Sequence, residues 1–207
     1  MNFDMVFDIQ HAYRQVVHAF AYPGEIVSLK QEADRLEAGL PCRAATGVLL
    51  YMLLDADTSF HAVEEEQLTD SIARLTYCQS CSLETAAHVI VTGKHRDRLC
   101  EIMQKVQTGT LEDPHLGATL LVECDSLQEG DELILRGPGI PHAHTIASPL
   151  NSDWVEVRAL VNEEFPLGFD MLLIDADANC MALPRTTQVE RGSDNGICSG
   201  KGRRTGN

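Results

Sequence analysis

The sequence predicts a single α/β domain of three layers built around one mixed β-sheet. Stretches with the 3.6-residue apolar period of a helix alternate with short apolar or β-branched runs typical of strands. Strands separated by helices favour parallel pairing, whereas closely spaced strands near the C-terminal end favour antiparallel pairing. The chain has 207 residues, enough for one buried core. We expect one domain over residues 1–190 and a disordered tail over 191–207, rich in Gly, Ser and basic residues.

The N-terminal half predicts three helices and two strands. Asp8 is placed to cap a first helix that ends at Pro23-Gly24. Pro41 is placed to begin a second helix, which is apolar nearly all round and therefore central. The apolar face of the first helix is expected to comprise Ile9, Tyr13, Val16, Val17 and Phe20. The other ranges expected are a strand at 25–29, helices at 43–54 and 65–75, and a strand at 60–63.

The C-terminal half alternates strands and helices more clearly. Its last two strands form a hairpin around a polar turn at Asp175, Asp177 and Asn179, closed by Pro184-Arg185-Thr186-Thr187. A lone arginine at such a hairpin favours either an anion contact or a partner contact, and these residues do not decide between the two. The expected ranges are strands at 87–92, 118–124, 133–136, 145–146, 171–174 and 180–183, and helices at 95–106 and 153–161.

Charge and composition restrict the classes of partner. The net charge is −15. Residues 1–190, which exclude the basic tail, carry 12 basic against 30 acidic groups. Such a body repels nucleic acid and anionic membranes, because affinity for both depends on cationic side chains. The sequence contains no apolar run near the roughly 20 residues that span a bilayer, and no signal peptide is recognised. The odd number of dispersed cysteines, seven, favours reduced, buried thiols in a cytoplasmic protein.

The loop after the strand at 133–136 is the first candidate ligand site. Gly137 and Gly139 can free backbone amides to hold a phosphate, and Arg136 can supply positive charge. The segment nevertheless lacks the spacing of a phosphate-binding loop or of a dinucleotide fingerprint. A tight loop with positive φ at the glycines is the simpler interpretation.

Metal and redox patterns in the sequence are incomplete. His142 and His144 would share one face of a strand, but no third ligand stands near them. Cys78 and Cys81 have redox or zinc spacing, but no second pair completes a zinc site and the motif follows a helix instead of opening one. One further set of acidic residues could hold a divalent cation: Glu163, Glu164, Asp170, Asp175 and Asp177. Turns and strand ends commonly contain aspartate, which explains the set as well.

Catalytic groups are not apparent. The chain has no Gly-x-Ser-x-Gly elbow, and no serine or cysteine stands in an evident partnership with histidine and a carboxylate. The lysines lie in polar surroundings, which is not the buried setting of a Schiff-base lysine. We therefore assign no catalytic residue, no cofactor and no metal ligand.

Several short motifs follow one another in a specific order along about 170 residues. They are 20–24, Pro41 with 44–57, 108–110, 117–120, 135–140, Phe165-Pro166-Leu167-Gly168 with Asp170, and Leu183-Pro184-Arg185-Thr186-Thr187. In this order they resemble the PhnH family, the H subunits of the bacterial carbon–phosphorus lyase core complex. The chain departs from the family at Pro138, where the family varies, and in the basic tail after Arg191.

The resemblance implies a fold like the large domain of pyridoxal-phosphate-dependent transferases, without the cofactor lysine. It also implies assembly with subunits G, I and J. With subunit L, that assembly displaces the adenine of ATP by an alkylphosphonate, giving alpha-D-ribose 1-methylphosphonate 5-triphosphate when the phosphonate is methylphosphonate. A later enzyme and the iron–sulfur chemistry of J then break the carbon–phosphorus bond. The resemblance implies that the H subunit is required but without assigned catalytic residues, forms a homodimer in isolation, and contacts J.

Three hypotheses follow from the sequence. The first is a non-catalytic interaction subunit of the complex, which explains the missing catalytic group. In the second, the chain itself binds nucleotide or phosphonate and takes part in catalysis. The third, a metalloenzyme using His142 and His144, has the least support. The residues expected to contact a ligand or partner are Arg136, Gly137, Gly139, Arg185, Thr186 and Thr187.

Overall fold

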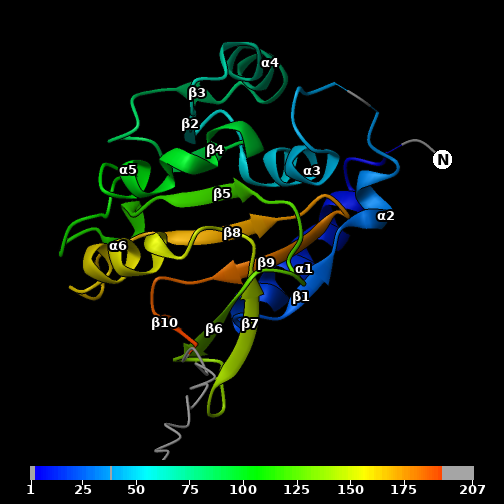
Figure 1. Ribbon diagram of the computed structural model, residues 1–207. Coiled ribbons are helices and arrows are strands. Elements are labelled where there is room, and N and C mark those ends of the chain that lie inside the picture. Colours follow the sequence, from blue (N-terminus) through cyan, green and yellow to red (C-terminus); the bar gives the residue numbers. More distant parts are fainter. Residues whose placement is uncertain (1–2, 38, 193–207) are drawn as a thin grey trace, which may run out of the picture.

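A computed structural model describes residues 3–37 and 39–192 of the chain. Its main element is a seven-stranded mixed sheet in the order β1-β9-β8-β5-β4-β2-β3 (Figure 1). Strands β8, β5, β4, β2 and β3 run parallel, and β9 is antiparallel to both β8 and β1. The strands are β1 (Ile26–Ser28), β2 (Ser59–Ala62), β3 (Gln79–Ser80), β4 (His88–Val91), β5 (Thr119–Glu123), β8 (Asp170–Ile174) and β9 (Asn179–Leu183).

A second, antiparallel sheet corrects the expectation of one sheet. It comprises β6 (Asp131–Arg136), β7 (His144–Ser148) and β10 (Gln188–Arg191) in the order β10-β6-β7. The expectation that disorder begins at residue 191 is also wrong, because Arg191 pairs with Leu133 and the Gly192 amide donates to the carbonyl of Glu132 at 2.8 Å. The rest of the tail, 193–207, lies outside the described residues.

The helices confirm most of the expected positions but not their ends. The second helix begins at Ala44 after an extended Arg43, so Pro41 does not start it. The helix expected at 95–106 is α-helical only over Leu99–Met103, because the residues before it form a 3₁₀ turn in which His95 has non-helical dihedral angles (φ −115°, ψ 16°). The helices are α1 (Phe7–Ala21), α2 (Lys30–Ala33), α3 (Ala44–Leu53), α4 (Glu66–Thr76), α5 (Leu99–Met103) and α6 (Asp153–Val161), with 3₁₀ turns η1 (Gly93–Arg98) and η2 (Pro114–Leu116).

Helix α1 differs from its expected cap and its expected buried face. The Asp4 carboxylate accepts the amides of Val6 and Phe7 at 2.8 and 2.9 Å, so Asp4 caps the helix in place of Asp8. Asp8 is instead buried and pairs with Arg35 at 2.6 Å. The buried positions of the helix are Asp8, Ala12, Val16 and Ala19, whereas Tyr13 and Val17 are exposed.

Two hydrophobic cores cover the two faces of the large sheet and give the molecule three layers. Helices α1 to α4 pack on one face, against Ile90, Leu121 and Leu172. Helices α5 and α6 and the small sheet lie on the other face (Figure 1). The core there includes Trp154. Because alternate residues of a strand point to opposite faces, the continuous apolar runs of β4, β5 and β8 supply both cores. Within the described residues no helix has the length and apolar character needed to cross a membrane.

A partly buried histidine in β4, His88, predicts a pH-dependent stability. Burial lowers the pKa of His88 to about 4, and its Nδ1 has no hydrogen-bond partner among the described residues. As the pH falls from about 6.5 to about 4, the unfolded chain binds a proton that the folded chain refuses, so the free energy of unfolding falls. The expected loss is on the order of 2–3 kcal/mol.

Urea unfolding of the wild type and of His88→Gln between pH 7 and pH 4.5 measures this effect. The stability advantage of the wild type over the variant should shrink as the pH falls. His115→Gln is the matched control, because the side chain of His115 is 74% exposed. A difference between wild type and His88→Gln that stays constant with pH would contradict the prediction.

Candidate functional site

The two loops that the sequence marks as candidate sites lie together. Residues of β6 and β10 pair, with Arg136 opposite Gln188. A Cβ at Gly137 (φ 136°) would lie 2.9 Å from the carbonyl oxygen of Thr186. At Gly139 (φ 82°) it would lie 2.3 Å from the carbonyl oxygen of Ala21. Both glycines therefore serve close backbone contacts, which supports the interpretation of this segment as a tight loop.

The guanidinium of Arg185 is fully engaged by the protein itself. Its Nε and Nη2 donate to the Asp170 carboxylate, with Nη2 2.7 Å from Oδ2. Nη1 donates to the carbonyl of Pro114 at 2.8 Å, and Nη2 also to that of Gly117 at 3.3 Å. The Arg185 side chain is only 15% exposed. This arginine joins the starts of β5 and β8 to the turn after β9, and its donors are occupied by these contacts.

Arg136 contacts a different part of the molecule. Its side chain is 49% exposed, with Nε 3.8 Å from the carboxylate of Glu190 and Nη1 3.4 Å from the carbonyl oxygen of His142. Arg136 and Arg185 therefore have separate partners, and the contacts of Arg185 do not favour a shared grip on one phosphate.

Arg158 is a residue of this region that the motif search missed. It is 2% exposed, and its guanidinium donates to the carbonyls of Thr187 at 2.7 Å, Pro184 at 2.6 Å and Leu183 at 3.2 Å. Burial lowers the pKa of Arg158 to about 10. Its burial could have been inferred from the sequence, because it lies four residues after Trp154 in the predicted helix and therefore on the same helical face. Arg158 holds the backbone of the turn from within the core.

The remaining sequence candidates have structural explanations. His144 lies in β7 but His142 precedes the strand, so the expected pairing on one strand face is wrong. Burial raises the pKa of Cys78, whose thiol donates to the carbonyl of Thr58 at 3.1 Å. Of the acidic set, the Asp175 carboxylate accepts two backbone amides of its own turn, and Asp170 pairs with Arg185. Over residues 3–37 and 39–192, no group of three or more His, Cys, Asp or Glu is arranged to hold a metal.

The described cysteines agree with the expectation of free thiols. Burial is the main cause that raises the pKa of Cys42, Cys124 and Cys180 to about 12. Such thiols stay protonated at neutral pH and are poor nucleophiles. The six cysteines within the described part of the chain are unpaired.

A polar cleft that the sequence did not reveal lies at the carboxyl ends of β2, β4 and β5. We call it the arginine cleft; its volume is about 530 Å³. The connection from β2 leads outward through α4 to β3, whereas the connection from β4 leads the other way through α5 to β5. Such a switch point, beyond the carboxyl ends of parallel strands, is where open α/β sheets bind ligands. The cleft is lined by Pro41, Cys42, Arg43, Glu65, Thr92, Gly93, Lys94, Arg96, Glu123 and Asp125.

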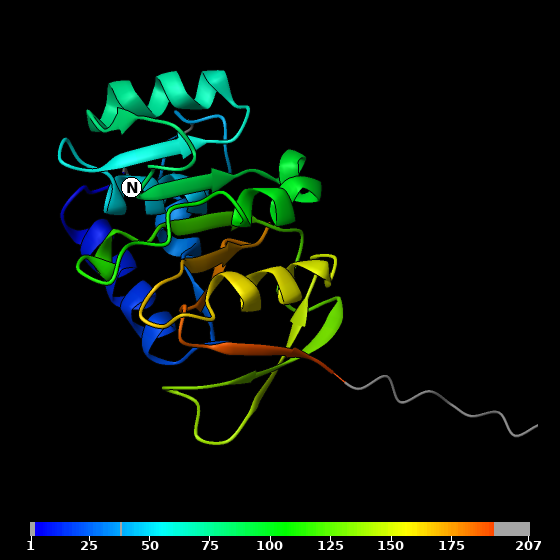
Figure 2. The ribbon, with the colours of Figure 1, turned by 90° about the vertical axis from the view of Figure 1, so that its left-hand side faces the viewer.

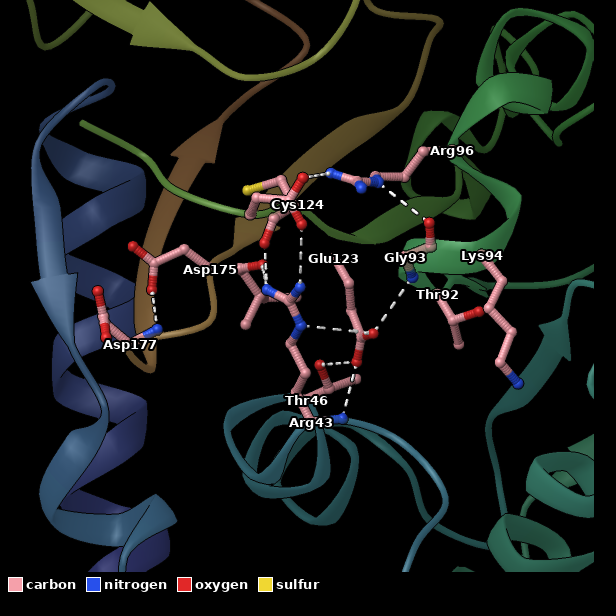
Figure 3. A network of polar contacts seen from close by, with 12 residues as sticks. Arg43, Thr46, Thr92, Gly93, Lys94, Arg96, Glu123, Cys124, Asp175 and Asp177 are labelled. Atoms are coloured by element: carbon pink, nitrogen blue, oxygen red, sulfur yellow. Dashed lines mark hydrogen bonds and ion pairs between the residues drawn. The ribbon is translucent and has the colours of Figure 1, made fainter. Parts of the chain in front are cut away.

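A buried carboxylate organises the floor of the arginine cleft. Glu123, at the end of β5, is 5% exposed. It accepts the amide of Arg43 at 2.9 Å, the hydroxyl of Thr46 at 2.8 Å and the amide of Gly93 at 3.3 Å (Figure 3). Glu123 therefore ties the start of α3 to the end of β4.

A second carboxylate lies at the side of the cleft. Glu65 pairs with Lys94 at 2.8 Å and accepts the hydroxyl of Thr92 at 3.1 Å. The hydrogen bond from Lys94 holds the pKa of Glu65 below its usual range. Glu65 is therefore ionised at neutral pH and neutralises Lys94.

Comparison with known proteins assigns the family. The family of the bacterial phosphonate metabolism protein (PhnH) matches residues 2–190 of the chain. The chain belongs to the PhnH family. The chain is also 34% identical over 181 residues to the putative C-P lyase subunit protein HtxG of Stutzerimonas stutzeri, covering 87% of this chain and 85% of that protein. The alpha-D-ribose 1-methylphosphonate 5-triphosphate synthase subunit PhnH of Rhizobium meliloti is 31% identical over 201 residues, covering 91% and 93% of the two chains.

The contacts of Arg185 predict a structural role in this PhnH-family chain. Arg185→Ala should lower the free energy of unfolding by about 3 kcal/mol, because it leaves the largely buried Asp170 carboxylate without its cation. Urea unfolding measures the loss. Arg136→Ala is the matched control, with an expected change within about 0.5 kcal/mol for an exposed residue. Equal stability of the Arg185→Ala variant and the wild type would show that the pair is dispensable.

Proposed function

We propose that this chain is a required, non-catalytic subunit of a carbon–phosphorus lyase core complex. Membership of the PhnH family supports this role, and so does the similarity to two proteins that are named as subunits of a C-P lyase and of the synthase. The assembly would contain subunits G, I and J, with this chain in direct contact with J and forming a homodimer when isolated. Together with subunit L it would displace adenine from ATP by an alkylphosphonate, giving alpha-D-ribose 1-methylphosphonate 5-triphosphate from methylphosphonate. We place this assembly in the cytoplasm, away from nucleic acid and membrane.

We also propose that the mixed sheet follows the fold of the large domain of pyridoxal-phosphate-dependent transferases, without their cofactor. The arrangement of a mixed sheet with helices on both faces supports the comparison. The polar surroundings of the lysines support a role without a Schiff base. The catalytic groups of the reaction would then belong to other subunits.

The exposed apolar face of α1 carries the proposal of a subunit contact. Three apolar side chains on one side of the helix are exposed: Val6, just before α1, by 71%, Tyr13 by 58% and Val17 by 46%. Tyr13 follows Val6 by seven positions and Val17 follows Tyr13 by four, which places all three on one helical face. Helix α1 runs along the outside of the molecule (Figure 2). Apolar side chains gathered on one outward helical face mark protein contacts, whereas scattered ones need no explanation. We assign this face, named the α1 face, to the contact with J.

Reconstitution of the synthase reaction with purified subunits tests the function directly. ATP and methylphosphonate are incubated with G, I, J and L in the presence and absence of this chain, and release of adenine is measured. The reaction should require the chain, and the chain alone should release no adenine. Full activity without it, or turnover by the isolated chain, would refute the proposal of a required, non-catalytic subunit.

The double variant Tyr13→Glu/Val17→Glu tests the α1 face. It should weaken co-purification with J by at least about tenfold, because it places two charges where apolar surface is buried. The double variant Leu111→Glu/Leu160→Glu is the matched control, since these leucines are 76% and 71% exposed on other elements. Circular dichroism and thermal unfolding establish that both variants are folded. Loss of J from the control but not from the α1 variant would exclude this surface.

A further inference from the structure

Two arginines of the arginine cleft converge on one exposed carboxylate. Asp125 lies 2.8 Å from Nη1 of Arg96 and 3.6 Å from Nη2 of Arg43. The side chain of Asp125 is 71% exposed, whereas those of Arg96 and Arg43 are 27% and 25% exposed. The guanidinium groups are therefore built into the wall of the cleft, and the carboxylate between them is the outermost of the three groups.

Backbone carbonyls hold both guanidinium groups from behind. Nη1 of Arg43 donates to the carbonyls of Cys124 and Ile174, and Nε of Arg96 donates to the carbonyl of Gly93 at 3.1 Å. The two side chains reach toward Cys124 from different elements, Arg43 from the start of α3 and Arg96 from η1 (Figure 3). Their positions therefore have support that does not depend on Asp125.

The other carboxylates of the cleft have partners of their own. Glu123 accepts three hydrogen bonds from the ends of neighbouring elements and lies 3.8 Å from Nε of Arg43, and Glu65 pairs with Lys94. Glu123 thus offsets part of the charge of Arg43, and both guanidinium groups still point donors at whatever occupies the position of Asp125. An ion pair with so exposed a carboxylate contributes only about 0–1 kcal/mol to stability, so the fold does not need Asp125 there.

We propose that the arginine cleft binds the phosphate or phosphonate group of a small molecule between Arg43 and Arg96. In the free protein the Asp125 carboxylate occupies that position, and it swings into solvent when the ligand binds. A planar guanidinium donates paired hydrogen bonds to phosphate oxygens, and two of them balance the charge of a dianion. The volume of about 530 Å³ leaves room for a ligand larger than phosphate itself.

Calorimetric titration of the full-length chain at low salt tests the site. The probes are inorganic phosphate, methylphosphonate and ATP, which distinguish a free anion, a phosphonate and a nucleotide. Asp125→Asn removes the competing carboxylate and should bind at least one probe about tenfold more tightly than the wild type, which corresponds to about 1.4 kcal/mol. Arg96→Met should weaken the same binding by at least about tenfold, because it removes charge-assisted hydrogen bonds.

Matched variants separate the site from general charge effects. Asp57→Asn removes an exposed loop carboxylate, and Arg74→Met removes an exposed arginine of α4. Both should leave the affinity within about twofold of the wild type, which is less than 0.5 kcal/mol. Circular dichroism and thermal unfolding confirm that each variant is folded; if Arg96→Met is not, Arg96→Gln replaces it.

The proposal is overturned if folded Asp125→Asn gives no heat with any probe at millimolar concentration. It is also overturned if Asp57→Asn tightens binding as much as Asp125→Asn, or if the Arg96 variant binds like the wild type. Binding of a peptide carboxylate in place of all three probes would equally reject a small-molecule phosphate site. The titration needs no other subunit, so its failure and the failure of the proposed assembly are separate results.

Discussion

The ion pair between Arg185 and Asp170 connects parts of the chain that no local pattern brings together. Asp170 begins β8, Arg185 follows β9, and the same guanidinium binds the carbonyls of Pro114 and Gly117 just before β5. A largely buried ion pair is tolerable only when hydrogen bonds satisfy its remaining donors, as the carbonyls do here. The close packing extends to the backbone, since a Cβ at Gly117 would lie 2.2 Å from the carbonyl oxygen of Gly168. These contacts hold the starts of β5 and β8 beside the end of β9.

Local physics accounts for what the sequence predicted correctly. Periodicity placed most helices and the strands that supply the two cores, because burial of one face imposes that periodicity. The separate small sheet was not predictable in the same way, since β10 pairs with β6 across more than fifty residues and strand runs do not specify their partners. The predicted start of the first helix was wrong because two residues, Asp4 and Asp8, are both suitable caps. Asp8 forms an ion pair with Arg35, and Asp4 caps the helix.

The candidate sites show the same division between local and long-range information. Gly137 and Gly139 have the positive φ angles expected of a tight loop. The loop contacts Thr186 because β6, which precedes the loop, pairs with β10, which follows Thr186. The use of Arg185 depends on Asp170 and on backbone carbonyls, which a motif search does not see. The arginine cleft was missed for a related reason. Arg43, Arg96 and Asp125 belong to three distant segments and form no sequence pattern until the parallel strands align their ends.

Although the chain has a net charge of −15, backbone carbonyls hold several of its arginine side chains in buried or partly buried positions. Arg158 is bound by three carbonyls of the turn after β9, and Arg43 by those of Cys124 and Ile174. A carbonyl satisfies the donors of a guanidinium without neutralising its charge, whereas a carboxylate does both. Arg158 is enclosed, so its charge serves the fold alone. Arg43, which also pairs with Glu123, and Arg96 line an open cleft, where the exposed Asp125 carboxylate lies between them. That difference supports the anion site proposed at the carboxyl edge of the sheet.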